Sequence, residues 1–229
     1  IGGATGGNSS KNNVATDVIT MATTGNAQEF GNLTQMKRMG ASATDGRSGF
    51  SLGGSNPSYN NVIQRFDMSS LGNRVDYSDL NVSKGDNKGG CGSHDGIDYD
   101  GIHPQLPSVT YMPGSGRAVL HVNGGDYDFF NINTQGNSVN FGDQRVSHTS
   151  AAGCSDLTRG VTTCERTGGT FAGTNMEYIE FASQGNAADF GDMATGHVLN
   201  SATSSTTRGI SLGGQSAGST SVNVIEYFT

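Results

Sequence analysis

The sequence predicts an all-β protein built from a repeated unit, and three observations carry that prediction. A pattern of Gly-Asn, three residues and an aromatic occurs four times, with spacings of 47, 64 and 49 residues between its glycines. Self-similarity at such a period is typical of repeat proteins. Short β-branched and aromatic runs are separated by Gly, Asn and Ser, as strands are by turns. Only 33% of the residues are hydrophobic, so we expect each unit to hold its own small core.

The first element of each unit is an apolar run directly before the Gly-Asn pair. These runs are rich in β-branched and aromatic residues and partly alternate, which predicts half-buried strands. They are Val18–Thr23, Val62–Met68, Phe129–Asn133 and Met176–Ala182. The pairs that follow begin at Gly25, Gly72, Gly136 and Gly185. We interpret each pair as a turn that tolerates positive φ.

The second element is the aromatic residue five positions after the glycine. The four aromatics are Phe30, Tyr77, Phe141 and Phe190. Two positions further on stand Asn32, Asp79, Asp143 and Asp192. A catalytic group is needed once, whereas a structural group is needed in every unit. We therefore interpret both sets as structural.

A second block recurs in three of the units. It spans Arg38–Gly54, His148–Cys164 and His197–Gly214. In each, a strand of small residues leads to a polar turn, an arginine closes the turn, and another strand begins. The arginines are Arg47, Arg159 and Arg208, which we expect to bond to carbonyls or carboxylates of the adjacent unit. Small residues and glycines suit innermost strands, where backbones approach closely.

A unit of about 45 to 50 residues with roughly four strands matches one blade of a β-propeller. We predict a single domain over residues 1–229, with repeats at 14–60, 61–127, 128–174 and 175–221 and a partial repeat at 222–229. The two ends of the chain supply the same elements instead of completing one blade. This is expected either of a small ring with an extra partial blade or of a segment of a larger propeller, and we favour the segment.

The repeats resemble known ones. Gly-Gly after a strand, a later apolar strand, and an aromatic followed by Leu or Met resemble the kelch repeat, although kelch units usually carry Trp where this chain has Phe or Tyr. The strings ATTGNAQEFGNL (Ala22–Leu33) and NVIEYFT (Asn223–Thr229) are similar to the kelch-like repeats of tail-fibre and other virion proteins of marine bacteriophages. The resemblance covers nearly the whole chain apart from one insertion.

The resemblance implies a non-enzymatic structural or adhesion protein at the virion surface, of the fibre or decoration type. Its partners would be other virion proteins or copies of itself, and host-surface carbohydrate. Two alternatives remain open: a cellular kelch-type protein-interaction module, and a propeller enzyme of the oxidase or glycan-processing type. A purely architectural role is not separable from adhesion by sequence.

The insertion, Gly85–Arg117, is where function is expected. It lengthens the second repeat by about 16 residues, and departures from a repeat map to loops that carry binding sites. The candidate binding residues are His94, Asp95, Asp98, Tyr99, Asp100, His103 and Tyr111. The aromatic rings would stack on sugars and the polar groups would hydrogen-bond to them.

The same segment is the best candidate for a metal site. Closely spaced carboxylates with glycines can wrap Ca²⁺, which gives Asp95, Asp98 and Asp100 as candidate ligands. The favoured interpretation is nevertheless a solvated polar turn, because the pattern matches no EF-hand loop. Zn²⁺ at Cys91, His94 and His103 lacks paired ligand spacing. We therefore predict no cofactor.

Composition and motifs exclude several classes. The net charge of -7 with only 13 Lys and Arg argues against nucleic-acid binding. The sequence contains no run of 18 apolar residues, so it does not predict a membrane-spanning segment. The sequence contains no GxSxG, HExxH or P-loop motif, so none of these motifs predicts an enzyme. The three cysteines form no complete disulfide framework; a Cys154–Cys164 pair is conceivable, and three unpaired thiols are favoured.

Overall fold

The structure is a computed structural model of the chain. It describes residues 14–20, 22–35, 40–44, 47–55, 58–84, 90–91, 116–122, 125–146, 151–156, 158–163, 173–216 and 220–229. Within these residues there is no helix, and seventeen strands form five antiparallel sheets. The prediction of an all-β protein is therefore confirmed.

The sheets follow one another along the chain, and we number them in that order. Sheet 1 contains β1 (Ala15–Val18) and β2 (Gln28–Asn32). Sheet 2 contains β3 (Ala41–Thr44), β4 (Ser48–Ser55), β5 (Tyr59–Asp67) and β6 (Val75–Lys84). Sheet 3 contains β7 (Gly90–Cys91), β8 (Arg117–Val122), β9 (Asp126–Asn131) and β10 (Val139–Asp143). Sheet 4 contains β11 (Ala152–Ser155), β12 (Arg159–Thr163), β13 (Asn175–Glu180) and β14 (Ala188–Asp192). Sheet 5 contains β15 (Ser201–Ser204), β16 (Gly209–Leu212) and β17 (Ile225–Phe228).

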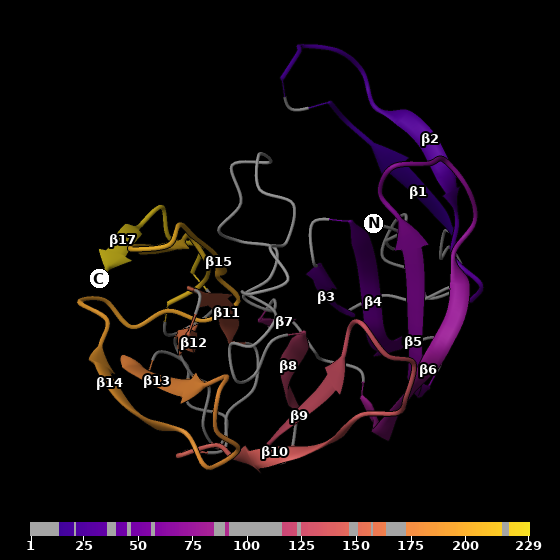
Figure 1. Cartoon of the computed structure of the whole chain (residues 1–229). Helices are drawn as coiled ribbons and strands as arrows, with labels where there is room; N and C mark the ends of the chain where they lie inside the picture. Colours follow the sequence, from indigo (N-terminus) through magenta and orange to yellow (C-terminus); the bar gives the residue numbers. More distant parts are fainter. Residues whose placement is uncertain are drawn as a thin grey trace.

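Each sheet is an up-and-down meander, and the sheets are set around an arc (Figure 1). The first strands of sheets 2 to 5, namely β3, β7, β11 and β15, lie on the inside of the arc, and the last strands β6, β10 and β14 lie on its outside. On the inside, β7 contacts both β3 and β11, and β11 contacts β15. Segments far apart in the sequence thus meet at the centre.

The hydrophobic core is divided among the spaces between neighbouring sheets. Sheets 2 and 3 share the largest cluster, which includes Phe50, Ile63, Tyr77, Leu80 and Phe130. Sheets 3 and 4 share a second cluster of Val119, Tyr127, Phe141, Ile179 and Phe181. Between sheets 4 and 5, Met176 and Met193 are covered by Phe190 and Phe228. Several small cores explain how a chain with few hydrophobic residues folds.

Three of the four predicted apolar strands coincide with the third strand of a sheet, β5, β9 or β13. The prediction for Val18–Thr23 is wrong, because β1 ends at Val18. In sheet 4, the equivalent later part of β13 pairs with β12, as Gly160 does with Ile179. Among the described residues, no strand of sheet 1 stands in the position of β12 beside the run after Val18, and Ile19 is exposed.

The recurring aromatic occupies the same special place in all four sheets that contain an outer strand. In each of these strands the pairing register shifts at this residue, where a β-bulge inserts an unpaired position; in sheet 2 a second shift lies between Asn60 and Val62. The bulged residues are Phe30, Tyr77, Phe141 and Phe190. The first three are buried and Phe190 is half-buried.

The three copies of the second block each form the predicted hairpin of strand, turn and strand: β3–β4, β11–β12 and β15–β16. One Gly-Gly pair, Gly53-Gly54, lies near the end of β4 and the other, Gly213-Gly214, directly follows β16; all four glycines have positive φ, with Gly213 at 59° and Gly214 at 109°. A Cβ on Gly214 would lie 2.4 Å from the carbonyl oxygen of Val198. Both the backbone conformation and the crowding therefore favour glycine there.

Candidate functional site: a binding face and an open junction

The Gly-Asn pairs join neighbouring sheets. In three junctions, the side-chain amide oxygen of the asparagine accepts a hydrogen bond from a backbone N–H in the outer strand of the preceding sheet. The bonds run from Asn32 N–H to Asn73 Oδ1 (3.0 Å), from Asp79 N–H to Asn137 Oδ1 (3.1 Å) and from Asp143 N–H to Asn186 Oδ1 (3.0 Å). We call this arrangement the Gly-Asn junction.

A second bond returns in each junction. The residue after the asparagine donates its N–H to the carbonyl of the same outer-strand residue. These bonds are Arg74 to Asn32 (2.8 Å), Ser138 to Asp79 (2.9 Å) and Ala187 to Asp143 (2.8 Å). The outer strand is otherwise a free edge, so the junction pairs backbone groups that would face solvent. These bonds use the backbone of Asn32, Asp79 and Asp143, so a structural role of their side chains stays a prediction.

The backbones at the junction approach very closely. A Cβ on Gly142, the residue after the bulged Phe141, would lie 2.1 Å from the carbonyl oxygen of Gly185. The second repeat has Ser78 at the equivalent position. There the side chain of Gln135 donates to the Tyr77 carbonyl (2.7 Å), whereas Gly185 donates its own N–H to the Phe141 carbonyl (3.0 Å). A side chain at this point thus changes how the junction is bonded.

The Gly-Asn pair is not itself the turn that the sequence suggested. None of its four glycines has positive φ. The chain reverses a few residues earlier, where Asp67 Oδ1 accepts bonds from the N–H (2.8 Å) and hydroxyl (2.6 Å) of Ser69. These bonds, the side-chain one first, lower the pKa of Asp67. The structure does not explain the glycines of the four pairs.

The recurring arginines have a different role from the expected one. Arg159 stacks on Tyr178 with 5.0 Å from its guanidinium carbon to the ring centre, and Arg208 stacks on Tyr227 at 4.8 Å. Each ring belongs to the third strand of the arginine's own sheet, so these contacts stabilise a sheet by cation–π attraction. Arg117 makes the same contact with Phe129 at 5.2 Å.

Arg117 also donates to the carbonyl of Phe181 in the neighbouring sheet. It is therefore the arginine that meets the prediction of a bond to an adjacent unit.

Arg47 was wrongly aligned with this set. The strand register places Ser48 at the position of Arg159, so Arg47 lies one residue earlier. In sheet 2 the arginine comes from the opposite strand: Arg65 stands at the position of Tyr178 and donates to Ser48 Oγ (2.9 Å). The pairing of Arg65 with Ser48 was not predicted from the sequence because the two residues lie on different strands.

The inner ends of sheets 2, 4 and 5 surround an open hollow of about 390 Å³. Its lining includes the last residues of β3, β11 and β15, which are Thr44, Ser155 and Ser204. Ser155 and Ser204 are joined by two hydrogen bonds, one from Ser155 N–H (3.2 Å) and one to the Ser155 carbonyl (2.6 Å). Phe66, which also lines the hollow, adds an aromatic surface to this ring of hydroxyls.

Tight turns connect the first and second strands of sheets 4 and 5 at this end. In sheet 4, Asp156 Oδ1 accepts bonds from the N–H groups of Thr158 (2.6 Å) and Arg159 (2.7 Å). In sheet 5, Ser205 Oγ accepts from the N–H of Arg208 (3.2 Å) in the same way. The side chain at the start of each turn therefore holds it closed.

In sheet 3 the predicted insertion replaces this turn. Cys91 pairs with Val119 and Cys154 pairs with Val161, so the segment between Cys91 and Arg117 corresponds to the turn before Arg159. The insertion therefore leaves from the same end of a sheet as the tight turns. Its seven candidate binding residues lie outside the described residues: His94, Asp95, Asp98, Tyr99, Asp100, His103 and Tyr111.

The candidate Ca²⁺ ligands also lie outside the described residues, as do His94 and His103 of the candidate Zn²⁺ set. In the part of the chain that the structure describes, no three His, Cys, Asp or Glu side chains are grouped to hold a metal ion. The described residues also contain no helix long and apolar enough to cross a membrane.

Cys154 is buried and belongs to no disulfide, so the conceivable Cys154–Cys164 pair is not formed. The register gives the reason: Cys154 lies opposite Val161, three residues before Cys164 in the chain. Burial, and secondarily the charge of Asp156, raises the pKa of the Cys154 thiol to about 12. The thiol is therefore protonated at neutral pH.

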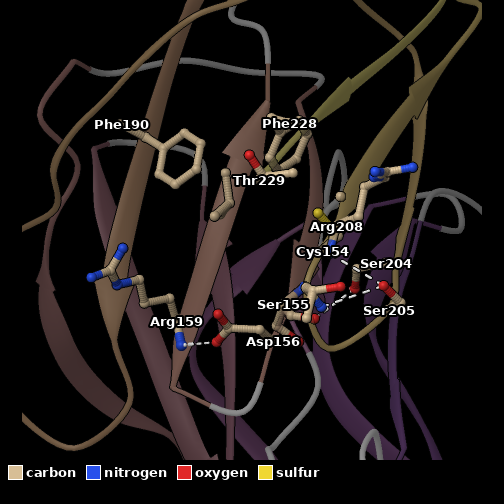
Figure 2. A pocket seen from close by; sticks show the side chains of 13 residues that line it. Cys154, Ser155, Asp156, Arg159, Phe190, Ser204, Ser205, Arg208, Phe228 and Thr229 are labelled. Carbon is tan, nitrogen blue, oxygen red and sulfur yellow. Dashed lines mark hydrogen bonds between the residues drawn. The ribbon is translucent and has the colours of Figure 1, made fainter.

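A different opening lies between sheets 4 and 5 (Figure 2). This pocket of about 80 Å³ is lined by Phe190, Phe228 and Thr229, with Arg159 and Arg208 on either side. Among the described residues, no Gly-Asn pair is bonded to the outer strand β14 here. A Cβ on Gly191 would meet nothing within 4 Å, in contrast to the 2.1 Å at Gly142. We call this place, where no described Gly-Asn pair bonds to the outer strand β14, the open junction.

The fold and these sites define a class: an all-β protein of small antiparallel sheets held together by a repeated junction. No protein-family model matches the chain, and no curated protein sequence matches it.

Proposed function

We propose that the sheets are blades of a kelch-like β-propeller. Three features support this: the four-stranded meanders in sequence order, the first strands gathered on the inside of the arc, and one type of junction between successive sheets. A propeller places loops from all its blades on one face, where they form a binding surface.

On this scaffold we propose a non-enzymatic structural and adhesive role, as a fibre- or decoration-type protein at the virion surface that recognises host-surface carbohydrate. One observation carries the proposal. The residues that recur are used in junctions and sheets, whereas the insertion joins β7 to β8, the pair of strand ends that a tight turn joins in sheets 4 and 5.

The chemistry of the hollow suits sugars. The exposed hydroxyl groups of Ser42 and Thr203 line it, and such groups both donate to and accept from sugar hydroxyls. Arg74, at the same hollow, stacks on Phe66 at 4.4 Å. Burial lowers the Arg74 pKa to about 10, so the side chain remains charged at neutral pH. Tyr99 and Tyr111 of the insertion would add stacking surfaces.

Deletion of Ser93–Pro113 tests the proposal. It leaves four residues between Cys91 and Arg117, the same number that separates Cys154 from Arg159. The shortened protein should keep its β-sheet circular dichroism and its cooperative unfolding, and should lose binding to host-cell surfaces and to arrayed glycans.

Shortening residues 164–172, which belong to the segment between β12 and β13, provides the matched control. Because the strands alternate in direction, this segment leaves the opposite end of its sheet, so binding should survive. Attachment that persists after deletion of Ser93–Pro113 in a folded protein contradicts the proposal.

A further inference from the structure

A polar groove of about 470 Å³ lies between sheets 2 and 3. Two arginines, Arg47 and Arg65, line it, and none of the described residues in its lining is Asp or Glu. Asn133, also in the lining, approaches Gly116, the residue before β8: a Cβ on Gly116 would lie 2.5 Å from Asn133 Nδ2. The groove therefore lies at the end of the sheets from which the insertion leaves.

The equivalent space between sheets 3 and 4 is filled differently. The strand registers place Arg65 where sheet 3 has Phe129, and Arg47 where sheet 3 has Gly116. Phe129 packs edge-to-face on Phe141, with 5.8 Å between the ring centres. Guanidinium groups thus replace an aromatic ring and a glycine between sheets 2 and 3. Because sheet 3 forms without an arginine at either position, the repeat itself does not require them.

Arg65 is held in position without a carboxylate partner. Its Nε (3.1 Å) and Nη2 (2.9 Å) both donate to Oγ of Ser48, whose side chain is buried. Among the residues that the structure describes, Arg65 forms no ion pair. A guanidinium carries five N–H donors, so this side chain keeps donors for a ligand after bonding to Ser48.

The second arginine acts on the same region. Asp67 lies outside the lining, and its lowered pKa is caused first by the bonds from Ser69 and then, to a smaller extent, by the charges of Arg47 and Arg65. Both guanidinium groups are thus close enough to influence one carboxylate. Asp67 Oδ1 is itself bonded to Ser69, and in the described part of the chain it forms no ion pair with Arg65.

We propose that this groove binds the carboxylate or sulfate group of an acidic saccharide, and that the anion accepts hydrogen bonds from Arg65 and Arg47. The planar fork of a guanidinium matches two oxygens of either group. The exposed amides of Asn133 and Gln135 line the same groove and can bond to hydroxyl groups of the sugar ring. The inference rests on the proposed carbohydrate-binding function and names the chemical class of the carbohydrate.

NMR titration with small sugars tests the site directly. At constant ionic strength, methyl glucuronide and a glucose sulfate should each shift the Arg65 Nε–H signal and the Asn133 side-chain amide signals in a saturable way. Neutral methyl glucoside should leave them unchanged. The two acidic sugars show whether the groove takes a carboxylate, a sulfate or both. Absence of a saturable shift with either of them, or an equal shift with methyl glucoside, overturns the proposal.

Charge-removing variants locate the binding. Arg65→Gln should weaken binding of the acidic sugars about 10- to 100-fold, read from the Asn133 side-chain amide. Arg47→Gln should weaken it in the same direction, and because Arg47 is exposed this variant should keep the fold. Arg145→Gln is the matched control, since it removes a guanidinium that is already paired with Asp189 (3.2 Å) and should leave binding unchanged. Equal weakening by Arg65→Gln and Arg145→Gln overturns the proposal.

A further variant copies the filled space between sheets 3 and 4. Arg65→Phe should abolish binding of the acidic sugars and keep cooperative unfolding; unchanged binding overturns the proposal. These measurements need no host cell, so they can fail separately from the adhesive function. If deletion of Ser93–Pro113 abolishes cell attachment but the acidic sugars shift no signal, only the present inference falls. If the sugars bind as expected but attachment survives the deletion, only the adhesive proposal falls.

Discussion

Asn186 and Asp143 belong to different sheets, yet the side-chain oxygen of Asn186 lies 3.0 Å from the backbone nitrogen of Asp143 and accepts its hydrogen bond. The same relation joins Asn73 to Asn32 and Asn137 to Asp79. A motif visible in the sequence as a simple repeat is thus the bond by which each sheet holds the preceding one.

Replacing Asn186→Ala should therefore destabilise the protein. The substitution removes one solvent-exposed hydrogen bond to the Asp143 N–H, which costs about 0.5–1.5 kcal/mol. Urea unfolding followed by circular dichroism measures the change. Asn26→Ala is the matched control, because no described residue bonds to Asn26, and should leave the free energy of unfolding of the monomer unchanged. Equal losses in the two variants would contradict the junction.

Gly142→Ala should cost about 1–3 kcal/mol, because the added methyl group would press against the Gly185 carbonyl and force the two sheets apart. Gly136→Ala is the comparison: nothing lies within 4 Å of its Cβ and its φ is not positive, so it should be neutral or slightly stabilising. Thermal unfolding of both proteins checks the difference. Similar melting temperatures would show that close approach does not matter there.

Sequence reasoning went furthest where one residue does the same work several times. The aromatic positions were identified because Phe30, Tyr77, Phe141 and Phe190 recur at one place, and each proved to be a β-bulge. The strand runs were likewise identifiable from β-branched and aromatic residues, except Val18–Thr23. Whether such a run forms a strand depends on a neighbouring strand, and the described part of sheet 1 contains none beside it.

The bonding partners were beyond such reasoning. Asn73 and Asn32 are 41 residues apart, and only the fold reveals that they are joined. For the same reason, the sequence did not reveal that sheet 2 uses Arg65 in place of an arginine in the turn, because Ser48 and Arg65 meet across two strands. The available signal for such a pair was that the residue types at the two positions change together from one repeat to another. The insertion was located by its broken period, and the strand register then gave its place in sheet 3.

Tyr127→Phe should destabilise the space between sheets 3 and 4. The Tyr127 hydroxyl donates to Glu177 Oε1 (2.7 Å) and contacts Thr162 Oγ1 (2.7 Å), and all three residues are buried. Loss of the hydroxyl leaves a buried carboxyl oxygen without this donor, at a cost of about 1–3 kcal/mol. Tyr178→Phe, which keeps the ring under Arg159, should cost less. Chemical unfolding of both variants distinguishes them, and equal costs would refute the buried network.

Cys154 should make stability depend on alkaline pH. Its folded pKa of about 12 exceeds the ordinary 9.0, so the unfolded state loses its proton first as pH rises. Its contribution is complete below pH 9 and is lost between about 9 and 12. Compared with Cys154→Ala, the wild-type protein should lose more free energy of unfolding over this interval. In a Cys91→Ser, Cys164→Ser background, the folded thiol should resist alkylation at pH 9; rapid modification without unfolding would contradict its burial.

Amide hydrogen exchange resolved by NMR tests the Gly-Asn junction most directly. In dilute protein, the N–H groups of Asn32, Asp79 and Asp143 should exchange slowly because each bonds to an asparagine of the next sheet, whereas the N–H of Asp192 at the open junction should exchange fast. Asn186→Ala should accelerate exchange at Asp143 and leave Asn32 and Asp79 protected. Equal protection of all four amides in the monomer, or fast exchange at all four, would contradict the account.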